Sequence, residues 1–242
     1  MGLKVLIRRQ IKGARKRGAL WARALDVLRL LPTAEGRARL WTRLAHDDEV
    51  HQTTPQTAEN RYPALFDLAA SLAPSAERIL SFGCSTGEEL VSLRHRFPNA
   101  EIVGTEINPR SRALARRRLG VDDRVTVVGP KGIHGTFDLI FALAVFQREP
   151  HKVAEMDLQD LAPLYPFQRF DSAVRDLVSR LRPRGLLCVD HAMYRLEDSS
   201  AASELEPLKG SPAMTGRLFG RDGRRLKRGS ARTIFRKLGE SP

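Results

Sequence analysis

Apolar residues recur at helical spacing in the N-terminal part of the chain, between residues 20 and 31. Five residues carry this repeat: Leu20, Ala24, Val27, Leu28 and Leu31. The spacing predicts a basic helix that Pro32 ends, followed by a second short helix from Glu35 to Leu44. Residues 47–60 are polar and show no periodicity, which indicates a loop.

From Arg61 onward, helical and strand patterns alternate. Helices are predicted over residues 62–72, 88–97, 109–119 and 170–181. Strands are predicted over residues 78–82, 101–106, 124–128, 137–142 and 186–190. Asn108 before the third helix, Pro109 at its first position and Gly120 after its end are typical helix-boundary residues. This alternation predicts a parallel sheet covered on both faces, with ligands at the carboxyl ends of its strands where the strand order reverses.

The tail of the chain has a different pattern. Residues 214–219 and 231–237 resemble two strands joined by a polar segment, which predicts a hairpin that closes one edge of the sheet. The predicted fold is therefore α/β: a Rossmann-like, mostly parallel sheet of about seven strands with helices on both faces, a C-terminal antiparallel hairpin and an N-terminal helical extension. We assign residues 1–50 to the basic helical extension and residues 51–242 to the main domain.

Composition narrows the class of protein. The 242 residues are 42% hydrophobic and 29% charged, which fits one medium-sized domain with a short appendage and excludes a disordered chain. The basic N-terminus has no continuous apolar segment and no cleavage site, so we expect no signal peptide. Cys84 and Cys188 both lie in apolar segments and imply no disulfide framework. These features together predict a cytoplasmic protein.

The most informative segment joins the first strand to the following helix. Gly83 and Gly87 enclose a short turn, and the helix N-terminus beyond it offers free amide groups to an anionic group. The spacing is not that of a dinucleotide site, and Glu88 and Glu89 in the first helical turn would repel a pyrophosphate. They suit a ligand that carries an ammonium and a sulfonium beside its own carboxylate, such as the methionyl part of S-adenosylmethionine. The alternative is a plain strand–turn–helix junction.

An acidic residue follows the second strand. Glu106 stands where, in this topology, a carboxylate accepts hydrogen bonds from both hydroxyls of a ribose. The alternative is a solvated strand end.

At these residues the sequence resembles the class I S-adenosylmethionine-dependent methyltransferases, over roughly residues 62–192. Residues 137–140 and 181–186 are similar to the fourth strand of that family and to the turn before its fifth. Residues 83–89 look like the glycine loop of chemotaxis-receptor methyltransferases. The resemblance implies S-adenosylmethionine as cofactor. The residues that it implies for cofactor binding are Phe82, Gly83, Cys84, Ser85, Thr86, Gly87, Glu88, Glu89, Glu106, Ile107 and Asn108.

The sequence departs from the family in two places. Ser81 stands where most members have an acidic residue, so Glu88 or Glu89 is expected to contact the methionyl amino group instead. Residues 129–131 replace the acidic residue that often meets the adenine amine. We interpret Cys84 as a small buried loop residue and not as a nucleophile, because two glutamates follow it and no basic neighbour is evident.

Candidates for catalysis must follow the fourth and fifth strands. These positions hold Phe146, Gln147 and Arg148, and then Asp190, His191 and Tyr194. His191 is the best candidate for a general base because its usual pKa lies near neutrality. The alternative is a hydrogen-bonded histidine with no catalytic part. His51 and His134 are expected at the surface, and no metal site is expected. Thr54, Arg61 and Tyr62, which lie in or just after the polar loop, are further candidates for ligand contact.

The methyl acceptor is expected to be a small molecule. The Asn/Asp-Pro-Pro-Tyr/Phe run of many nucleic-acid methyltransferases is absent after the fourth strand, where residues 142–146 read Ala-Leu-Ala-Val-Phe. Two alternatives stay open because the net charge is +13. One is a nucleic-acid methyltransferase that binds phosphates through the basic N-terminal helix. The other is a non-catalytic scaffold or peripheral membrane protein that uses the same helix. The oligomeric state is not indicated.

Overall fold

The computed structural model describes residues 30–45, 51–52, 57–227 and 229–239. Its contacts divide the chain into two units, Met1–Asp47 and Asp48–Pro242. The first unit contains helix α2 (Ala34–Ala45), at whose start the Thr33 hydroxyl accepts a hydrogen bond from the backbone amide of Gly36 at 2.9 Å. The predicted helix before Pro32, with its basic residues, lies outside the described residues.

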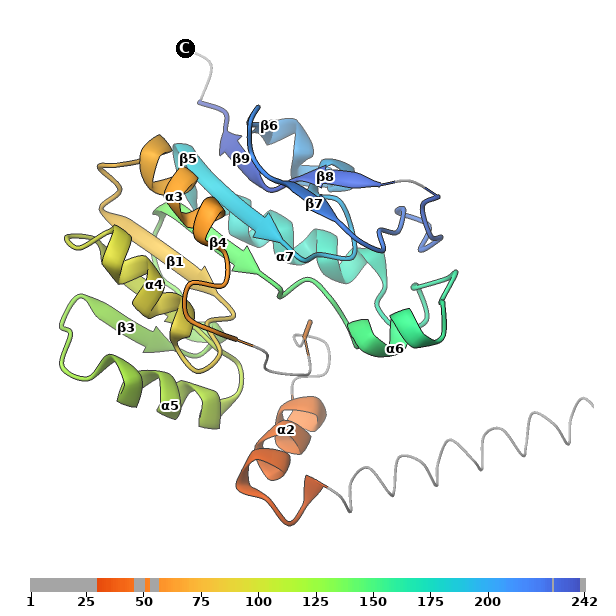
Figure 1. The fold of residues 1–242 in the computed structure, drawn as a ribbon, viewed down its shortest axis with the longest axis horizontal. Coiled ribbons are helices and arrows are strands. Elements are labelled where there is room, and N and C mark those ends of the chain that lie inside the picture. Colours follow the sequence, from red (N-terminus) through yellow and green to blue (C-terminus); the bar gives the residue numbers. More distant parts are fainter. Residues whose placement is uncertain (1–29, 46–50, 53–56, 228, 240–242) are drawn as a thin grey trace, which may run out of the picture. The chain divides into compact units, whose positions relative to one another are not determined.

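The second unit is built around a seven-stranded sheet (Figure 1). Its strands in chain order are β1 (Arg78–Phe82), β2 (Glu101–Thr105), β3 (Val125–Val128), β4 (Phe137–Leu143), β5 (Leu181–Asp190), β6 (Leu205–Pro207) and β9 (Ile234–Lys237). The order across the sheet is β3-β2-β1-β4-β5-β9-β6, and only β9 runs antiparallel to its neighbours. The order reverses between β1 and β4, so their carboxyl ends mark the expected ligand site.

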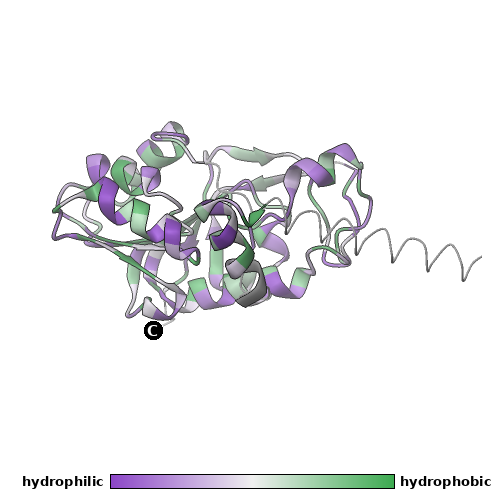
Figure 2. Ribbon diagram, turned by 90° about the horizontal axis from the view of Figure 1, so that it is seen from below, coloured by the Kyte–Doolittle hydropathy of each residue, from purple (hydrophilic) through white to green (hydrophobic). Residues whose placement is uncertain are grey.

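Helices cover both faces of this sheet. Helices α3 (Pro63–Leu72), α4 (Glu88–Arg96) and α5 (Pro109–Leu119) lie on one face, and α7 (Phe167–Ser179) lies on the other (Figure 1). The short helix α6 (Pro150–Glu155) and the 3-10 turns η1 (Pro130–Gly132), η2 (Leu196–Asp198) and η3 (Ser200–Glu204) complete the connections. Hydrophobic and hydrophilic residues alternate along the helices, as expected for helices with one buried side (Figure 2).

Two hydrophobic layers result from the alternation of side chains along each strand. Ile79 of β1 packs with Phe66 of α3 and Leu90 of α4, whereas the next residue, Leu80, belongs to the layer that contains Val174 of α7. Because successive strand residues point to opposite faces, buried strands become apolar almost throughout. The predicted α/β architecture is confirmed. Within the described residues, no helix combines the length and the apolar character needed to span a bilayer.

The C-terminal pairing differs from the prediction. Strands β7 (Ala213–Thr215) and β8 (Ser230–Arg232) form an antiparallel pair, but this pair is a separate two-stranded sheet. The chain leaves it at Thr233, whose hydroxyl donates to the Pro212 carbonyl at 2.7 Å, and β9 then joins the main sheet. The three-residue strand β6, too short to show a periodic pattern, pairs with the other side of β9.

Residues 181–186, which resemble the turn before the family's fifth strand, lie inside β5. Phe137 pairs with Leu181 and Leu139 pairs with Leu186, so four residues of β5, 182–185, lie opposite the single residue Asp138 of β4. The extra residues form an irregular bulge with Arg184 at a positive φ of 65°. Helix α7 also begins earlier than predicted, at Phe167, because its first apolar residues extend the buried face.

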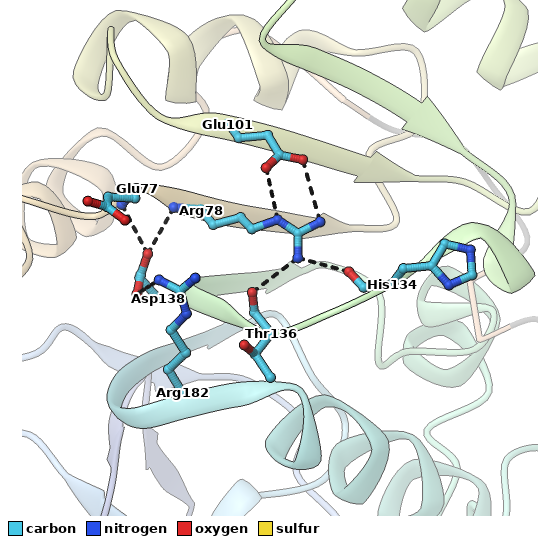
Figure 3. A network of polar contacts seen from close by, with 7 residues as sticks. All are labelled: Glu77, Arg78, Glu101, His134, Thr136, Asp138 and Arg182. Atoms are coloured by element: carbon cyan, nitrogen blue, oxygen red, sulfur yellow. Dashed lines mark hydrogen bonds and ion pairs between the residues drawn. The ribbon is translucent and has the colours of Figure 1, made fainter.

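A polar network ties together the amino ends of the strands (Figure 3). The Asp138 carboxylate accepts hydrogen bonds from the backbone amides of Glu77 and Arg78 at 3.0 and 2.9 Å, and it pairs with Arg182 at 2.8 Å. Arg78 pairs with Glu101 and donates to the carbonyls of residues 134 and 136. The network therefore joins β1, β2, β4 and β5 at the edge opposite to the expected ligand site.

We expect Asp138→Ala to destabilise the fold by about 1–3 kcal/mol, because two backbone amides and one guanidinium lose their acceptor. Urea unfolding measures this change. The matched control is Glu101→Ala, which removes only an exposed ion pair and should cost less than about 1 kcal/mol. Equal losses in the two variants would contradict this assignment.

Candidate functional site

The glycine turn follows β1 and crosses the end of β2. The backbone amides of Gly83 and Cys84 both donate to the Thr105 carbonyl at 2.9 Å, and the Gly87 amide donates to the Cys84 carbonyl at 3.0 Å. Gly83 and Gly87 have φ of 84° and 94°, in the left-handed region that favours glycine. A Cβ on Gly83 would lie 2.5 Å from a methyl group of Val145. The turn therefore requires glycine both for its backbone and for its close packing.

Glu106 closes the turn from the neighbouring strand. One of its carboxylate oxygens accepts from the Ser85 amide at 3.0 Å, and the other accepts from the Asn108 amide at 2.7 Å. Burial raises the pKa of Glu106, and these hydrogen bonds together with the charge of Arg112 oppose the rise. A carboxylate oxygen accepts about two hydrogen bonds, so each oxygen keeps capacity for a ligand hydroxyl.

The residues after Glu106 fix the start of α5. The Asn108 side chain accepts from the backbone amides of Arg110 and Ser111 at 2.9 and 3.2 Å, as the sequence predicted for a helix cap. The Arg112 guanidinium donates to the carbonyls of Glu106 and Ile107 at 2.8 and 3.0 Å. The side chain of Asn108 is thus used within the fold, and Ile107 is partly buried beside it.

The two glutamates of the first turn of α4 point to different partners. Glu88 pairs with Arg118 of α5 at 2.6 Å and accepts from the Thr86 hydroxyl at 2.7 Å. Glu89 instead accepts from the Ser81 hydroxyl at 2.7 Å, at the end of β1. Ser81 is fully buried, and burial raises the pKa of Glu89 to about 7. The acidic group that the family has at the position of Ser81 is therefore supplied here by the side chain of Glu89, which lies beside Ser81.

Neither cysteine has the character of a nucleophile. Both are buried free thiols, and burial raises the pKa of each well above its usual value. The charges of nearby glutamates, Glu106 for Cys84 and Glu89 for Cys188, raise these pKa values further. The interpretation of Cys84 as a buried loop residue is confirmed.

His191 lies just beyond β5, with 52% of its side chain exposed. Its backbone amide donates to Asp190 at 2.6 Å, its Nδ1 lies 3.2 Å from the same carboxylate oxygen, and its ring meets the edge of the Tyr62 ring with centroids 5.4 Å apart.

The Tyr62 hydroxyl is buried without a hydrogen-bond partner among the described residues. The Arg61 guanidinium lies 5.2 Å from the Tyr62 ring. Thr54 lies outside the described residues.

The expectation that His51 is a surface residue is wrong. His51 is only 7% exposed, and its Nδ1 lies 2.5 Å from the hydroxyl of Tyr165. Aromatic rings surround it, because its ring packs edge-on against Phe146 and Phe82 with centroids 5.2 and 6.4 Å apart. The residues next to His51 in the sequence are polar, so the sequence contains no sign of its burial. The aromatic rings that cover His51 come from segments far away in the sequence. His134 is exposed, as expected.

Tyr165 and Tyr194 belong to the same cluster. The Tyr194 hydroxyl donates to the backbone carbonyl of Tyr165 at 2.5 Å, and both residues are fully buried. Tyr194 was among the sequence candidates, whereas Tyr165 was missed because it lies in a connection without periodicity. Arg148, another candidate, is 9% exposed and lies close enough to His51 to lower its pKa. Gln147 donates from its side chain to the Ala144 carbonyl at 3.1 Å.

Strained backbone gathers at this edge of the sheet. Ser85 after β1, Ala144 and Glu149 after β4, and His191 after β5 all have positive φ, between 45° and 57°. Residues other than glycine adopt this conformation only where the surroundings hold them, and such residues concentrate at functional sites. The glycine turn, Glu106, Glu89 and His191 all lie at the same carboxyl edge.

This combination of strand order, glycine turn and acid after β2 defines a Rossmann-like ligand-binding domain. Residues 80–187 match a family model described as a methyltransferase domain. The segment from Leu80 to Leu187, a little under half of the chain, is therefore similar to a methyltransferase domain. This finding confirms the family that the sequence resembles. The narrower likeness of residues 83–89 to chemotaxis-receptor methyltransferases stays a prediction.

Curated relatives share part of the chain. A trans-aconitate 2-methyltransferase of Methylobacterium nodulans is 36% identical over 96 residues, which are 39% of this chain and 37% of the relative. Another, from Variovorax paradoxus, is 39% identical over 61 residues, 25% of this chain and 24% of the relative. The chain thus matches 37% or less of the length of these two relatives. Among solved structures, the N-methyltransferase NodS from Bradyrhizobium japonicum is similar over 74% of this chain and 99% of that chain, with 16% identity and a TM-score of 0.47.

We expect Glu89→Gln to change how stability depends on pH. Between its usual pKa of 4.5 and its folded value of about 7, Glu89 holds a proton in the folded state that the unfolded state lacks. Its contribution to stability therefore falls as pH rises through this window. Removing the carboxyl should abolish this decline, by up to about 3 kcal/mol, in urea unfolding followed from pH 4.5 to 7.5.

His51 makes stability rise with pH, which is the opposite effect. Burial and the charges of two arginines lower its pKa to about 3, so the unfolded state binds the proton more readily than the folded state. The difference between variant and parent isolates Glu89. Glu101→Gln, which alters an exposed acid, is the control and should leave the slope unchanged. A Glu89→Gln variant with the slope of the parent would rule out the raised pKa.

Proposed function

We propose that this chain transfers the methyl group of S-adenosylmethionine to a small-molecule acceptor. The observation that carries the proposal is the junction of the glycine turn with Glu106 through the Ser85 amide, because it combines a seat for an amino-acid head group with an acceptor for ribose hydroxyls. The methyltransferase-domain match covers both parts of this junction.

The residues at the turn fit such a donor. The buried hydroxyls of Ser85 and Tyr62 have no hydrogen-bond partner among the described residues, so each can bond to a ligand. Gly83 packs closely against Val145, which leaves no room for a side chain there. In this proposal, Glu89 binds the donor's ammonium group and Glu106 binds its ribose. Glu88 does not contact the donor in this proposal. It pairs with Arg118 of α5 and so holds the start of α4 in place.

The chemistry is an in-line displacement. When bound, the donor supplies a methyl group activated by its sulfonium. A lone pair of the acceptor forms the new bond to the methyl carbon, and the electrons of the carbon–sulfur bond return to sulfur, which leaves as a neutral thioether. Because the methyl group is already activated, the protein contributes chiefly by alignment. We assign His191 to proton removal from acceptors that need it, since Asp190 holds its ring beside Tyr62.

A small acceptor is supported by two observations. The curated relatives are named trans-aconitate 2-methyltransferases, and trans-aconitate is a small molecule. Residues 142–146 comprise the last two residues of β4 and the three that follow it. They lack the Asn/Asp-Pro-Pro-Tyr/Phe sequence typical of enzymes that methylate nucleic-acid amino groups. The nucleic-acid and membrane alternatives depend on the basic helix before Pro32, and no observation on the described residues favours them.

We expect Glu106→Ala to weaken binding of S-adenosylhomocysteine, the demethylated donor, by roughly 10- to 100-fold, because ribose hydroxyls lose a charged acceptor. Isothermal titration calorimetry measures the affinity. Glu101→Ala, at the other end of the same strand, is the matched control and should bind normally. Unchanged affinity in a folded Glu106→Ala protein would refute the assignment.

His191→Ala separates catalysis from donor binding. If His191 removes a proton, its loss should lower kcat by roughly 100-fold, within the range typical of general bases, and should leave donor affinity unchanged. Methyl transfer from radiolabelled donor, followed across pH, measures the effect. A variant with the parent's kcat and pH profile would exclude the role of base.

A further inference from the structure

The first turn of α5 places a guanidinium group at the end of β2. One nitrogen of Arg112 donates to the Glu106 carbonyl at 2.8 Å and to the Ile107 carbonyl at 3.0 Å. The same nitrogen lies 3.4 Å from the point where a Cβ on Gly129, the residue after β3, would stand. Contacts with the backbone therefore hold this cation between the carboxyl ends of β2 and β3.

The hydrogen bonds of Glu106 show why its ionisation matters for a ribose. Each of its carboxylate oxygens already accepts one backbone amide, from Ser85 at 3.0 Å and from Asn108 at 2.7 Å. Because an oxygen accepts about two hydrogen bonds, one position on each is left for a ribose hydroxyl. A proton on either oxygen would occupy that position and turn the oxygen into a donor. Only the ionised carboxyl group can accept from both hydroxyls.

The surroundings of Glu106 oppose its ionisation. Its side chain is buried, and burial raises its pKa. The charges of Glu106, Glu89 and Glu88 all act on the thiol of Cys84, so three carboxyl groups gather around the glycine turn. Glu88 has a cation of its own, because Arg118 pairs with it at 2.6 Å. A negative charge on Glu106 therefore needs a separate source of stabilisation.

The cation that supplies this stabilisation is Arg112. Its charge lowers the pKa of Glu106, as do hydrogen bonds from three backbone amides. The neighbouring Cys84 thiol is neutral, because its own pKa is raised. Arg116, one turn further along α5, donates instead to the Val127 carbonyl at 3.1 and 2.6 Å.

We propose that Arg112 is a positioning residue for the methyl donor: its guanidinium, held on the backbone of Glu106, keeps that carboxyl group ionised, so that both ribose hydroxyls find an acceptor. Arg112 acts through Glu106 and makes no contact with the donor. This inference rests on the proposed methyl transfer and adds a residue that the sequence did not indicate.

The test uses matched variants of the full chain. Arg112→Gln removes the charge, whereas Arg112→Lys keeps the charge and loses the planar fork. Arg116→Gln is the control, because Arg116 lies on the same helix and its guanidinium donates to the backbone of β3. Circular dichroism checks that each variant folds, and Arg112→Met replaces Arg112→Gln if that protein does not.

The main probe is 5′-methylthioadenosine, which carries the ribose and lacks the amino-acid group. Its binding therefore does not involve the ammonium group that we assign to Glu89. Calorimetry measures its affinity from pH 5.5 to 8.5, and S-adenosylhomocysteine is titrated in parallel.

We expect Arg112→Gln to weaken binding of 5′-methylthioadenosine by roughly 10-fold or more at pH 5.5 and by much less at pH 8.5. Without the cation, the pKa of Glu106 rises, so a proton occupies the carboxyl group up to a higher pH. Arg112→Lys should keep the pH profile of the parent, even if its affinity is lower by one factor throughout. Arg116→Gln should match the parent. In a Glu106→Gln background, Arg112→Gln should lose its pH-dependent effect.

Two results would overturn the role of Arg112 while S-adenosylhomocysteine still binds. One is a loss by the same factor at every pH in Arg112→Gln, or no loss at all, which would leave Arg112 a support for the backbone only. The other is an Arg112→Lys protein that follows the profile of Arg112→Gln. Failure of S-adenosylhomocysteine to bind the parent at any pH would instead refute the proposed methyl transfer.

Discussion

The carboxylate of Glu106 holds together two pieces of backbone that are far apart in the sequence. It accepts from the Ser85 amide in the glycine turn and from the Asn108 amide at the start of α5. The Thr105 carbonyl adds a second link by accepting from Gly83 and Cys84. The shape of the proposed donor site depends on these bonds, because a turn with so many positive-φ residues has no regular backbone pairing of its own.

The proposed donor site carries two acidic side chains on different elements. Glu106 follows β2 and suits the ribose hydroxyls of S-adenosylmethionine, and Glu89 lies in the first turn of α4 and suits its ammonium group. Because the two carboxyl groups have different hydrogen-bond partners, each is positioned independently of the other.

The sequence predicted the fold well because the boundaries of the main helices and strands are marked by particular residues. Asn108 and Gly120 mark the two ends of α5. The strands are recognised as short apolar segments between the helices. The two failures of the prediction have different causes. β6 is three residues long, and the burial of His51 depends on Phe82, Phe146 and Tyr165, whose proximity only the tertiary structure creates. The glycine turn was found because its chemistry is local, whereas the cluster around His51 is not.

The amino ends and the carboxyl ends of the strands serve different purposes. The network of Arg78, Asp138 and Arg182 joins the strands at their amino ends (Figure 3). The glycine turn, Glu106 and His191 lie at the carboxyl ends of the strands. Mutations that alter the acceptor therefore leave the amino-edge network intact. This separation makes the scaffold evolvable: new acceptor preferences can arise by drift in the loops after β4 and β5 while the chain keeps its margin of stability.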